Sequence, residues 1–206
     1  MSRSRALATE AVLATGNAGK LREMAALLAP IGLRLIAQGE LGIAAAAETA
    51  VTFVENALQK ARHASAAAGL PAIADDSGLV VPALGGAPGV RSARYAGDDA
   101  TAAQNNRKLI GALAGIEDRS AWFYCALIFI ERPEDPAPLL ATGLWRGRII
   151  DQPRGEGGFG YDPHFLVPRL GRTSAELAPE EKNALSHRGQ AVAALLQRLR
   201  ERGDRP

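Results

Sequence analysis

The amino-acid sequence predicts an α/β fold, and three observations support that prediction. Residues 10–37 follow the order strand, tight loop, helix, strand, which is typical of layered α/β proteins. Residues 121–130 carry the strongest strand signal, because they are dense in aromatic and β-branched side chains. Residues 52–69 place helix start and stop signals around alanines at helical spacing.

The composition is that of a globular protein. A length of 206 residues allows one large domain or two tightly joined lobes, and we expect a single domain over residues 1–206. With 47% hydrophobic and 22% charged residues, disorder over most of the chain is excluded. A single cysteine excludes an intramolecular disulfide and a zinc site built from cysteines.

Charge and hydropathy limit the partners. The formal net charge of +2 is too small for a nucleic-acid-binding footprint, so we expect no nucleic-acid partner. No apolar run reaches the ~18–20 residues of a membrane span, and we expect no membrane partner. Arg3 and Arg5 precede an apolar run, but Glu10 interrupts it, which does not fit a signal peptide. We therefore expect a soluble, cytoplasmic protein.

The first half of the chain alternates strands and helices. Residues 10–15 predict a strand, and apolar residues at helical spacing from Leu21 to Leu28 predict a helix that Pro30 and Gly32 end. Thr52 and Glu55 form a capping box that opens a second helix. Further predicted elements are a strand over 33–37, a strand over 72–75, a long loop over 85–98 and a helix over 99–114.

The second half begins with the strand over 121–130 and its predicted partner over 138–150. A glycine-rich loop and a short strand over 165–167 follow. Pro179, with acidic residues beside it, opens a short helix, and a final helix covers about 187–202.

A glycine-containing loop follows the first predicted strand. Its residues are Thr15, Gly16, Asn17, Ala18, Gly19 and Lys20. Glycines at a strand-to-helix turn expose backbone N–H groups, the helix start adds positive potential, and Lys20 adds a cation, so the loop suits a polyphosphate. It fails the P-loop pattern, because Ala14 stands at the first glycine position and Leu21 replaces the Ser or Thr that would hold Mg²⁺. A plain turn with a solvated lysine is the alternative.

Two adjacent carboxylates, Asp75 and Asp76, stand at the end of the predicted strand over 72–75 and precede Ser77 and Gly78. On a strand they face opposite sides, so one is able to face a cleft while the other is held in the scaffold. A carboxylate in a cleft can bind Mg²⁺ and orient a water molecule. A turn in which these side chains make local hydrogen bonds is the alternative.

The loop over 155–163 satisfies Gly-x-Gly-x-x-Gly formally, but prolines flank it where a dinucleotide fold needs a strand and a helix. We interpret it as a loop whose backbone approaches a ligand closely. Phe159 or Tyr161 would stack on a flat base, and Asp162 would accept a hydrogen bond from the base or ribose. A loop that packs its own aromatic side chains is the alternative.

Lys182, His187 and Arg188 lie at a break between the last two predicted helices. Lys182 and Arg188 are suited to phosphate or to the keto oxygen of a purine, and Arg offers a fixed fork of donors for such acceptors. The alternative is that the basic residues solvate a helix end and the histidine makes a structural hydrogen bond.

In this order the segments resemble the inosine triphosphate pyrophosphatase family, the XTP/dITP diphosphatases. The similarity extends from Val12 to about Leu199. The blocks that carry it are Ala14–Lys20, Thr52–Ala57, Ala72–Leu79, Gly85–Val90, Gly158–Pro163 and Ser186–Gly189.

The resemblance implies a long mixed β-sheet with helices on both sides, and two lobes flanking an active-site cleft. It implies a homodimer that hydrolyses non-standard purine nucleoside triphosphates (ITP, dITP and XTP) to the monophosphate and pyrophosphate, with Mg²⁺. Such an enzyme would keep these bases out of DNA and RNA.

The resemblance also implies residue roles. Asp76 would be the general base and a Mg²⁺ ligand. Glu48 is the candidate second metal ligand, although Ala47 stands where many relatives have a further acid. Lys60 matches a family lysine at the cleft. The substrate-binding residues would be Thr15, Gly16, Asn17, Ala18, Gly19 and Lys20 for the phosphates, and Ser77, Phe159, Gly160, Tyr161, Asp162, Lys182, His187 and Arg188 for the rest of the nucleotide.

Two other classes of protein are alternatives. A non-catalytic nucleotide sensor on the same scaffold would keep the glycine loops and lose the acids, whereas Asp75 and Asp76 are both present. A single-stranded nucleic-acid binder using Phe159 and Tyr161 would require a broad positive groove, which the small net charge does not favour.

Overall fold

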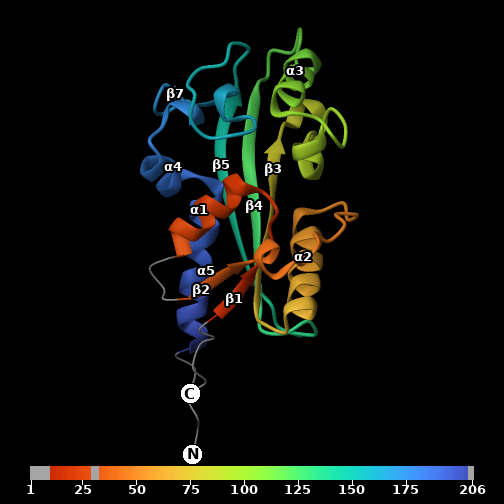
Figure 1. Cartoon of the computed structure of the whole chain (residues 1–206). Helices are drawn as coiled ribbons and strands as arrows, with labels where there is room; N and C mark the ends of the chain where they lie inside the picture. The colour runs from red at the N-terminus through yellow and green to blue at the C-terminus, as the bar shows by residue number, and fades with distance from the viewer. Residues whose placement is uncertain (1–9, 29–32, 204–206) are drawn as a thin grey trace, which may run out of the picture. The chain divides into compact units, whose positions relative to one another are not determined.

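The computed structural model describes residues 10–28 and 33–203 (Figure 1). The helices and strands are β1 (Glu10–Leu13), α1 (Ala18–Leu28), β2 (Arg34–Ala37), α2 (Phe53–Ala68), β3 (Ala72–Val80), α3 (Ala102–Ala112), β4 (Ser120–Ile130), β5 (Leu139–Ile149), β6 (Phe165–Val167), β7 (Arg172–Thr173), α4 (Pro179–Leu185) and α5 (His187–Gly203). The predicted helix end at Pro30 and Gly32, and the segment with Arg3 and Arg5, lie outside the described residues.

Within the described residues, seven strands form one sheet in the order β2-β1-β3-β4-β5-β6-β7. β1 runs parallel to both β2 and β3, whereas β6 is antiparallel to both β5 and β7. The sheet is therefore mixed and long, as the resemblance implies. The α/β class predicted from the opening segment is confirmed.

The chain forms two compact units. The first comprises residues 1–76, 125–142 and 188–206, and the second comprises 77–124 and 143–187. Each of the long strands β3, β4 and β5 has residues in both units, since the limits at 76, 124 and 142 fall inside them. The expectation of a single domain over the whole chain stays a prediction.

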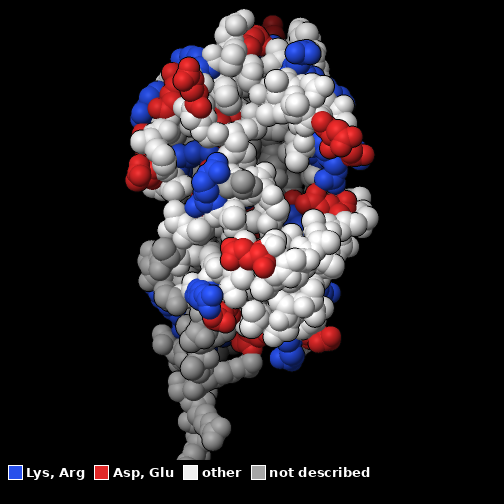
Figure 2. Space-filling view, in the orientation of Figure 1, with Lys and Arg blue, Asp and Glu red and all other residues white. Residues whose placement is uncertain are grey.

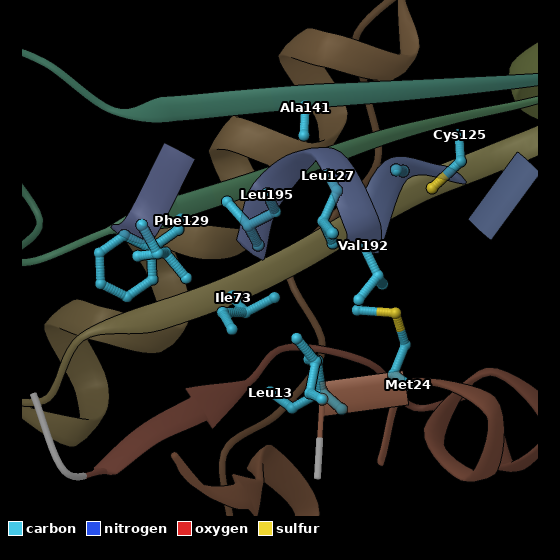
Figure 3. Packing of buried hydrophobic residues seen from close by; sticks show 12 residues of the cluster. Leu13, Met24, Ile73, Cys125, Leu127, Phe129, Ala141, Val192 and Leu195 are labelled. Carbon is cyan, nitrogen blue, oxygen red and sulfur yellow. The ribbon is translucent and has the colours of Figure 1, made fainter. Parts of the chain in front are cut away.

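The core of the first unit is a layer of apolar side chains between the sheet and two helices. Leu13, Ile73 and Leu127 project from β1, β3 and β4 onto Met24 of α1 and Val192 of α5 (Figure 3). Helix α2 lies on the other side of these strands (Figure 1). Its buried residues include Ala57, Ala61 and Ala64, whose small side chains allow close approach to the sheet. Helices therefore cover both faces of the sheet in this unit.

The core of the second unit is aromatic. The rings of Phe123 on β4 and Phe165 on β6 lie 4.6 Å apart between centroids, and Trp145 on β5 lies 5.3 Å from Phe165. Gly147 makes this packing possible, because a Cβ at this position would meet the Phe165 ring at 2.5 Å. The aromatic run over 121–130 that predicted a strand thus also supplies the core of this unit.

Helix α2 begins and ends as its sequence predicts. Thr52 is the N-cap: its hydroxyl accepts a hydrogen bond from the Glu55 N–H and donates one to the Glu55 carboxylate. Gly69 ends the helix with a φ of +67°, a conformation that favours glycine. The strand predicted over 72–75 is too short, because β3 continues through Asp75, Asp76 and Gly78 to Val80.

The surface carries charges of both signs. Lys and Arg side chains are interspersed with Asp and Glu over the face shown in Figure 2. Among the residues that the structure describes, no helix has both the length and the apolar character needed to cross a membrane.

Candidate active site

The two aspartates of β3 lie in different surroundings, as strand alternation predicts. The Asp75 carboxylate is fully buried and lies 2.9 Å from the Lys20 ammonium and 3.8 Å from Arg188 Nε. Arg188, whose side chain is 2% exposed, also pairs with Glu23 of α1. Burial opposes ionisation of Asp75, but the cations of Lys20, Arg188 and Lys60 outweigh it and hold the pKa of Asp75 well below its usual range. Asp75 is thus the anionic centre of a buried ion network.

The carboxylate of Asp76 is held by two residues of α2. Asn56 Nδ2 donates to one carboxylate oxygen at 3.1 Å, and Lys60 Nζ donates to the other at 3.4 Å. Burial raises the pKa of Asp76, and the nearby charge of Glu48 adds to the increase, while Lys60, Lys20 and Asn56 oppose it. A carboxylate of raised pKa in a fixed orientation is suited to accept a proton from water.

Asn56 itself is fixed from the other side. It is completely buried, its amide oxygen accepts the Ala50 N–H at 3.0 Å, and its amide nitrogen also donates to the Ala50 carbonyl at 3.3 Å. Asn56 and Lys60 are four residues apart, so they lie on the same face of α2 one turn from each other. One helix face therefore orients both oxygens of Asp76.

Glu48 and Asp76 converge on the same cation. Lys60 Nζ donates a hydrogen bond to Glu48 at 2.9 Å as well as to Asp76. Burial lowers the pKa of Lys60, but the negative charges of Asp75, Asp76 and Glu48 outweigh burial, so the pKa of Lys60 is raised. In residues 10–28 and 33–203, no group of three or more His, Cys, Asp and Glu side chains is arranged to hold a metal ion. The hard oxygens of Glu48 and Asp76 still fit Mg²⁺, which commonly binds one or two carboxylates and fills its shell with water and phosphate.

The predicted phosphate loop is organised by Asn17. Its side-chain oxygen accepts the N–H groups of Gly19 at 2.9 Å and Lys20 at 3.1 Å, so Asn17 caps the start of α1. Thr15 in turn accepts the Asn17 N–H at 3.2 Å. Gly16 is exposed and a Cβ there would meet open space. The exposed part of the loop is Gly16 and Asn17, and the Lys20 side chain reaches back to Asp75.

In the second unit, Asp162 organises the glycine-rich loop. Its buried carboxylate accepts the Phe159 N–H and the Lys182 ammonium, both at 2.8 Å, and the Ser174 hydroxyl at 2.9 Å. Gly158 has a φ of +73°, and a Cβ there would lie 2.2 Å from an Asp162 oxygen. Similarly, a Cβ on Gly155 would meet the Ala175 backbone at 2.6 Å. These two glycines are therefore required by packing within the chain itself.

The aromatic side chains of this loop divide into two kinds. Tyr161 belongs to the buried core and donates its hydroxyl to the Ser92 carbonyl at 2.8 Å, and burial raises the pKa of this hydroxyl. Phe159 is half-buried, and the Lys182 ammonium lies 4.9 Å from its ring centroid. Phe159 is thus the more exposed of the two rings, and Lys182 lies over it.

The residues predicted around the last helix break fall into both units. His187 is buried in the second unit, where its ring stacks on Phe123 at 4.8 Å, and Lys182 joins Asp162 there. Arg188 belongs to the first unit with Asp75. Ser77 is half-buried on β3. The first unit brings together Lys20, Glu48, Lys60, Asp75, Asp76 and Arg188.

Comparison with known proteins identifies the family of the chain. A model described as the Ham1 family matches residues 11–198, nearly the whole chain. The chain belongs to the Ham1 family. This Ham1-family chain is 60% identical to a dITP/XTP pyrophosphatase of Ralstonia nicotianae over 192 aligned residues. The alignment covers 92% of this chain and 96% of the relative. It is 58% identical over 191 residues to a dITP/XTP pyrophosphatase of Escherichia coli O157:H7, and that alignment covers 92% of this chain and 97% of the relative.

Solved structures of Ham1 proteins have the same fold. The HAM1 protein from Coxiella burnetii is similar with a TM-score of 0.87 and 52% identity, over 93% of this chain and 98% of that one. The Staphylococcus aureus Ham1 protein is similar with a TM-score of 0.83 and 38% identity, over 94% of this chain and 99% of that one. The resemblance found in the sequence motifs is confirmed.

Three residues that contact candidate site residues of this Ham1-family chain, two in the first unit and one in the second, were missed by sequence reasoning. They are Asn56, Glu23 and Asn106, whose amide nitrogen donates to the Gly160 carbonyl at 3.0 Å. A signal existed only for Asn56, because it stands one helical turn before Lys60 on a helix rich in alanine. The partners of Glu23 and Asn106 are too far away in sequence to be indicated by spacing.

Proposed function

We propose that this chain hydrolyses non-standard purine nucleoside triphosphates (ITP, dITP and XTP) between the α and β phosphates, giving the monophosphate and pyrophosphate. The observation that carries the proposal is the Asp76 carboxylate, oriented by Asn56 and Lys60 beside Glu48. Its support is the name dITP/XTP pyrophosphatase, which relatives 58–60% identical over nearly the full chain carry. Removal of these nucleotides would keep their bases out of DNA and RNA.

In the proposed reaction Asp76 acts as the general base. It accepts a proton from a water molecule while the water oxygen attacks the α phosphorus. The bond from that phosphorus to the bridging oxygen breaks, and pyrophosphate leaves with the electron pair. Burial favours this role, because it raises the pKa of Asp76 and so makes its carboxylate a stronger base.

The cations of the first unit would balance the charge of the substrate. A triphosphate carries about four negative charges, which must be neutralised before a nucleophile can approach. Lys60 and Lys20 are the candidates among this chain's residues, together with the loop over 15–20. Glu48 and Asp76 would hold Mg²⁺, which supplies further neutralisation of the phosphate oxygens when bound.

Base selection is assigned to residues of the second unit, whereas Arg188, which was also a candidate, is buried in the first unit against Asp75 and Glu23. Phe159 would stack on the purine, and Gly160, Asp162, Lys182 and His187 would complete the pocket. Hypoxanthine and xanthine carry a keto oxygen that accepts hydrogen bonds, whereas adenine carries an amino donor at that position. A buried donor of the pocket that faces the amino group of adenine leaves both donors unpaired, which costs ~1–3 kcal/mol or more and would disfavour ATP.

The product of the reaction tests the proposal. We expect ITP, dITP and XTP to be turned over faster than ATP and GTP, with pyrophosphate and monophosphate appearing in equal amounts, and EDTA to stop turnover. Anion-exchange chromatography of a labelled nucleotide panel measures this. Stepwise release of orthophosphate through a diphosphate would contradict the proposed bond, and binding of ITP without turnover would favour a sensor.

We also expect a homodimer. The long strand β4 carries Trp122 and Tyr124 half-buried on one face, while Phe123 and Cys125 on the other face are buried. A second copy that covers these aromatic rings would remove their apolar area from water. Light scattering at micromolar concentration should give twice the chain mass of 21.6 kDa. A strictly monomeric mass would refute the dimer.

We assign the chain to the cytoplasm, because its proposed substrates belong to the pool of nucleotides used for DNA and RNA synthesis. Cell fractionation followed by detection of the protein tests this assignment, and recovery in a membrane fraction would overturn it.

A further inference from the structure

Lys60 links the two carboxylates that are candidates for metal binding. Its ammonium lies 2.9 Å from Glu48 and 3.4 Å from Asp76, so the two carboxylate oxygens are no farther apart than the sum of these distances. The side chains of Lys60 and Asp76 are 12% and 5% exposed, and that of Glu48 is 26% exposed. Two carboxylates held so close and so poorly solvated require a cation near them.

We infer that Lys60 is a stand-in cation: in the metal-free protein its ammonium takes the place of the divalent ion between Glu48 and Asp76, and it must leave when the metal binds. A lysine suits this exchange, because it is a compact point charge on a flexible four-carbon stem. Its backbone is fixed in the middle of α2, so only the side chain has to move.

The geometry around Asp76 preserves the site during the exchange. Asn56 holds the carboxylate oxygen that Lys60 does not contact, and Asn56 is itself fixed by both backbone groups of Ala50. Asp76 therefore keeps its orientation when the ammonium leaves. The displaced ammonium then gains an additional anionic partner when a triphosphate is present.

Metal binding should consequently be weak in the free protein and stronger with nucleotide, so that the metal arrives together with its substrate. This inference rests on the proposed function for the identity of the metal site. It concerns the nucleotide-free protein, however, and its test does not depend on turnover.

The test is binding of Mn²⁺ alone to the nucleotide-free protein, measured by calorimetry or by the loss of the free-ion EPR signal. Lys60→Met removes the charge and keeps most of the side-chain volume. A neighbouring charge changes the proton affinity of a carboxylate by about ten- to a thousandfold, so we expect Lys60→Met to bind Mn²⁺ at least about tenfold more tightly than the natural protein. Lys60→Arg, which keeps the charge, should show no such gain.

Three further measurements complete the design. Lys108→Met is the matched control: it also removes one positive charge, but from an exposed lysine that contacts Tyr95 in the second unit, and it should leave Mn²⁺ affinity unchanged. Adding Glu48→Gln to Lys60→Met should abolish most of the gain. In EDTA, Lys60→Met should melt below the natural protein, and Mn²⁺ should reverse that difference.

Unchanged or weaker Mn²⁺ binding by Lys60→Met would overturn the inference, even if hydrolysis of ITP proceeds as proposed. If Lys60→Met does not fold, Mn²⁺ binding and the melting temperature are measured on Lys60→Gln in its place. Tighter Mn²⁺ binding in a protein that fails to hydrolyse ITP would support the stand-in role and count against the proposed function alone.

Discussion

Asp76→Asn should reduce turnover of ITP by at least ~10²-fold while leaving the fold intact. Asparagine keeps the shape of the side chain and an oxygen for hydrogen bonding, but it cannot accept a proton from water near neutral pH. It also binds Mg²⁺ poorly, because this ion prefers charged oxygens. Single-turnover kinetics with ITP measure the loss.

Without divalent metal, the same variant should bind ITP with nearly unchanged affinity, since the loops over 15–20 and 155–163 keep their residues. Its melting temperature should stay close to that of the natural protein, because the amide keeps an oxygen for Asn56 and Lys60 keeps Glu48 as its anionic partner. Near-normal turnover by Asp76→Asn would remove Asp76 as the base and shift attention to Asp75 or Glu48.

Asp75→Asn should act on stability. The substitution leaves the volume unchanged but deprives Lys20 and the buried Arg188 of their shared anion. Removing one partner of a buried ion pair is typically destabilising by about 3–5 kcal/mol, which for a chain of this size lowers the melting temperature by roughly 10 °C. Any loss of turnover should accompany this loss of stability.

The control for Asp75→Asn is an exposed ion pair of the same unit. Glu10 pairs with Arg34, and the side chains are 37% and 72% exposed. Glu10→Gln should change stability by less than about 1 kcal/mol, because solvent screens such a pair. If Asp75→Asn melted at the same temperature as Glu10→Gln, the buried network would not be a stabilising one.

The effect of Asp75 should also depend on pH in a defined direction. Its pKa is depressed in the folded protein, so its contribution to the free energy of unfolding is fully present above the unfolded pKa of about 4. The contribution is lost progressively as the pH falls from there through the folded pKa. The difference in stability between the natural protein and Asp75→Asn should therefore shrink below about pH 4.

Local signals in the sequence were enough to predict elements that depend on local physics. Thr52 and Gly69 delimit α2, and the aromatic run over 121–130 predicts β4. The continuation of β3 beyond Asp75 was missed because Asp, Ser and Gly disfavour strands. Ion pairs with distant residues compensate here, and such tertiary contacts override local preference.

The candidate site was only partly predictable for a related reason. The opposite surroundings of Asp75 and Asp76 follow from strand alternation, which a sequence shows directly. The contact of Arg188 with Glu23 joins residues 165 positions apart, and no spacing rule indicates it. The resemblance to known relatives identified residues such as Asp76 as functional, but it did not indicate that Asn56 orients this carboxylate.

Because the two aspartates are neighbours on one strand, the candidate site is sensitive to insertions and deletions in that strand. A shift of one residue in a strand moves every side chain to the opposite face. Inserting or deleting one residue between Ala72 and Asp75 would turn one carboxylate towards Asn56 and Lys60 and the other towards Lys20 and Arg188, with their order in the chain reversed. Substitutions in this stretch are able to act on one face at a time, whereas a change in its length alters both at once.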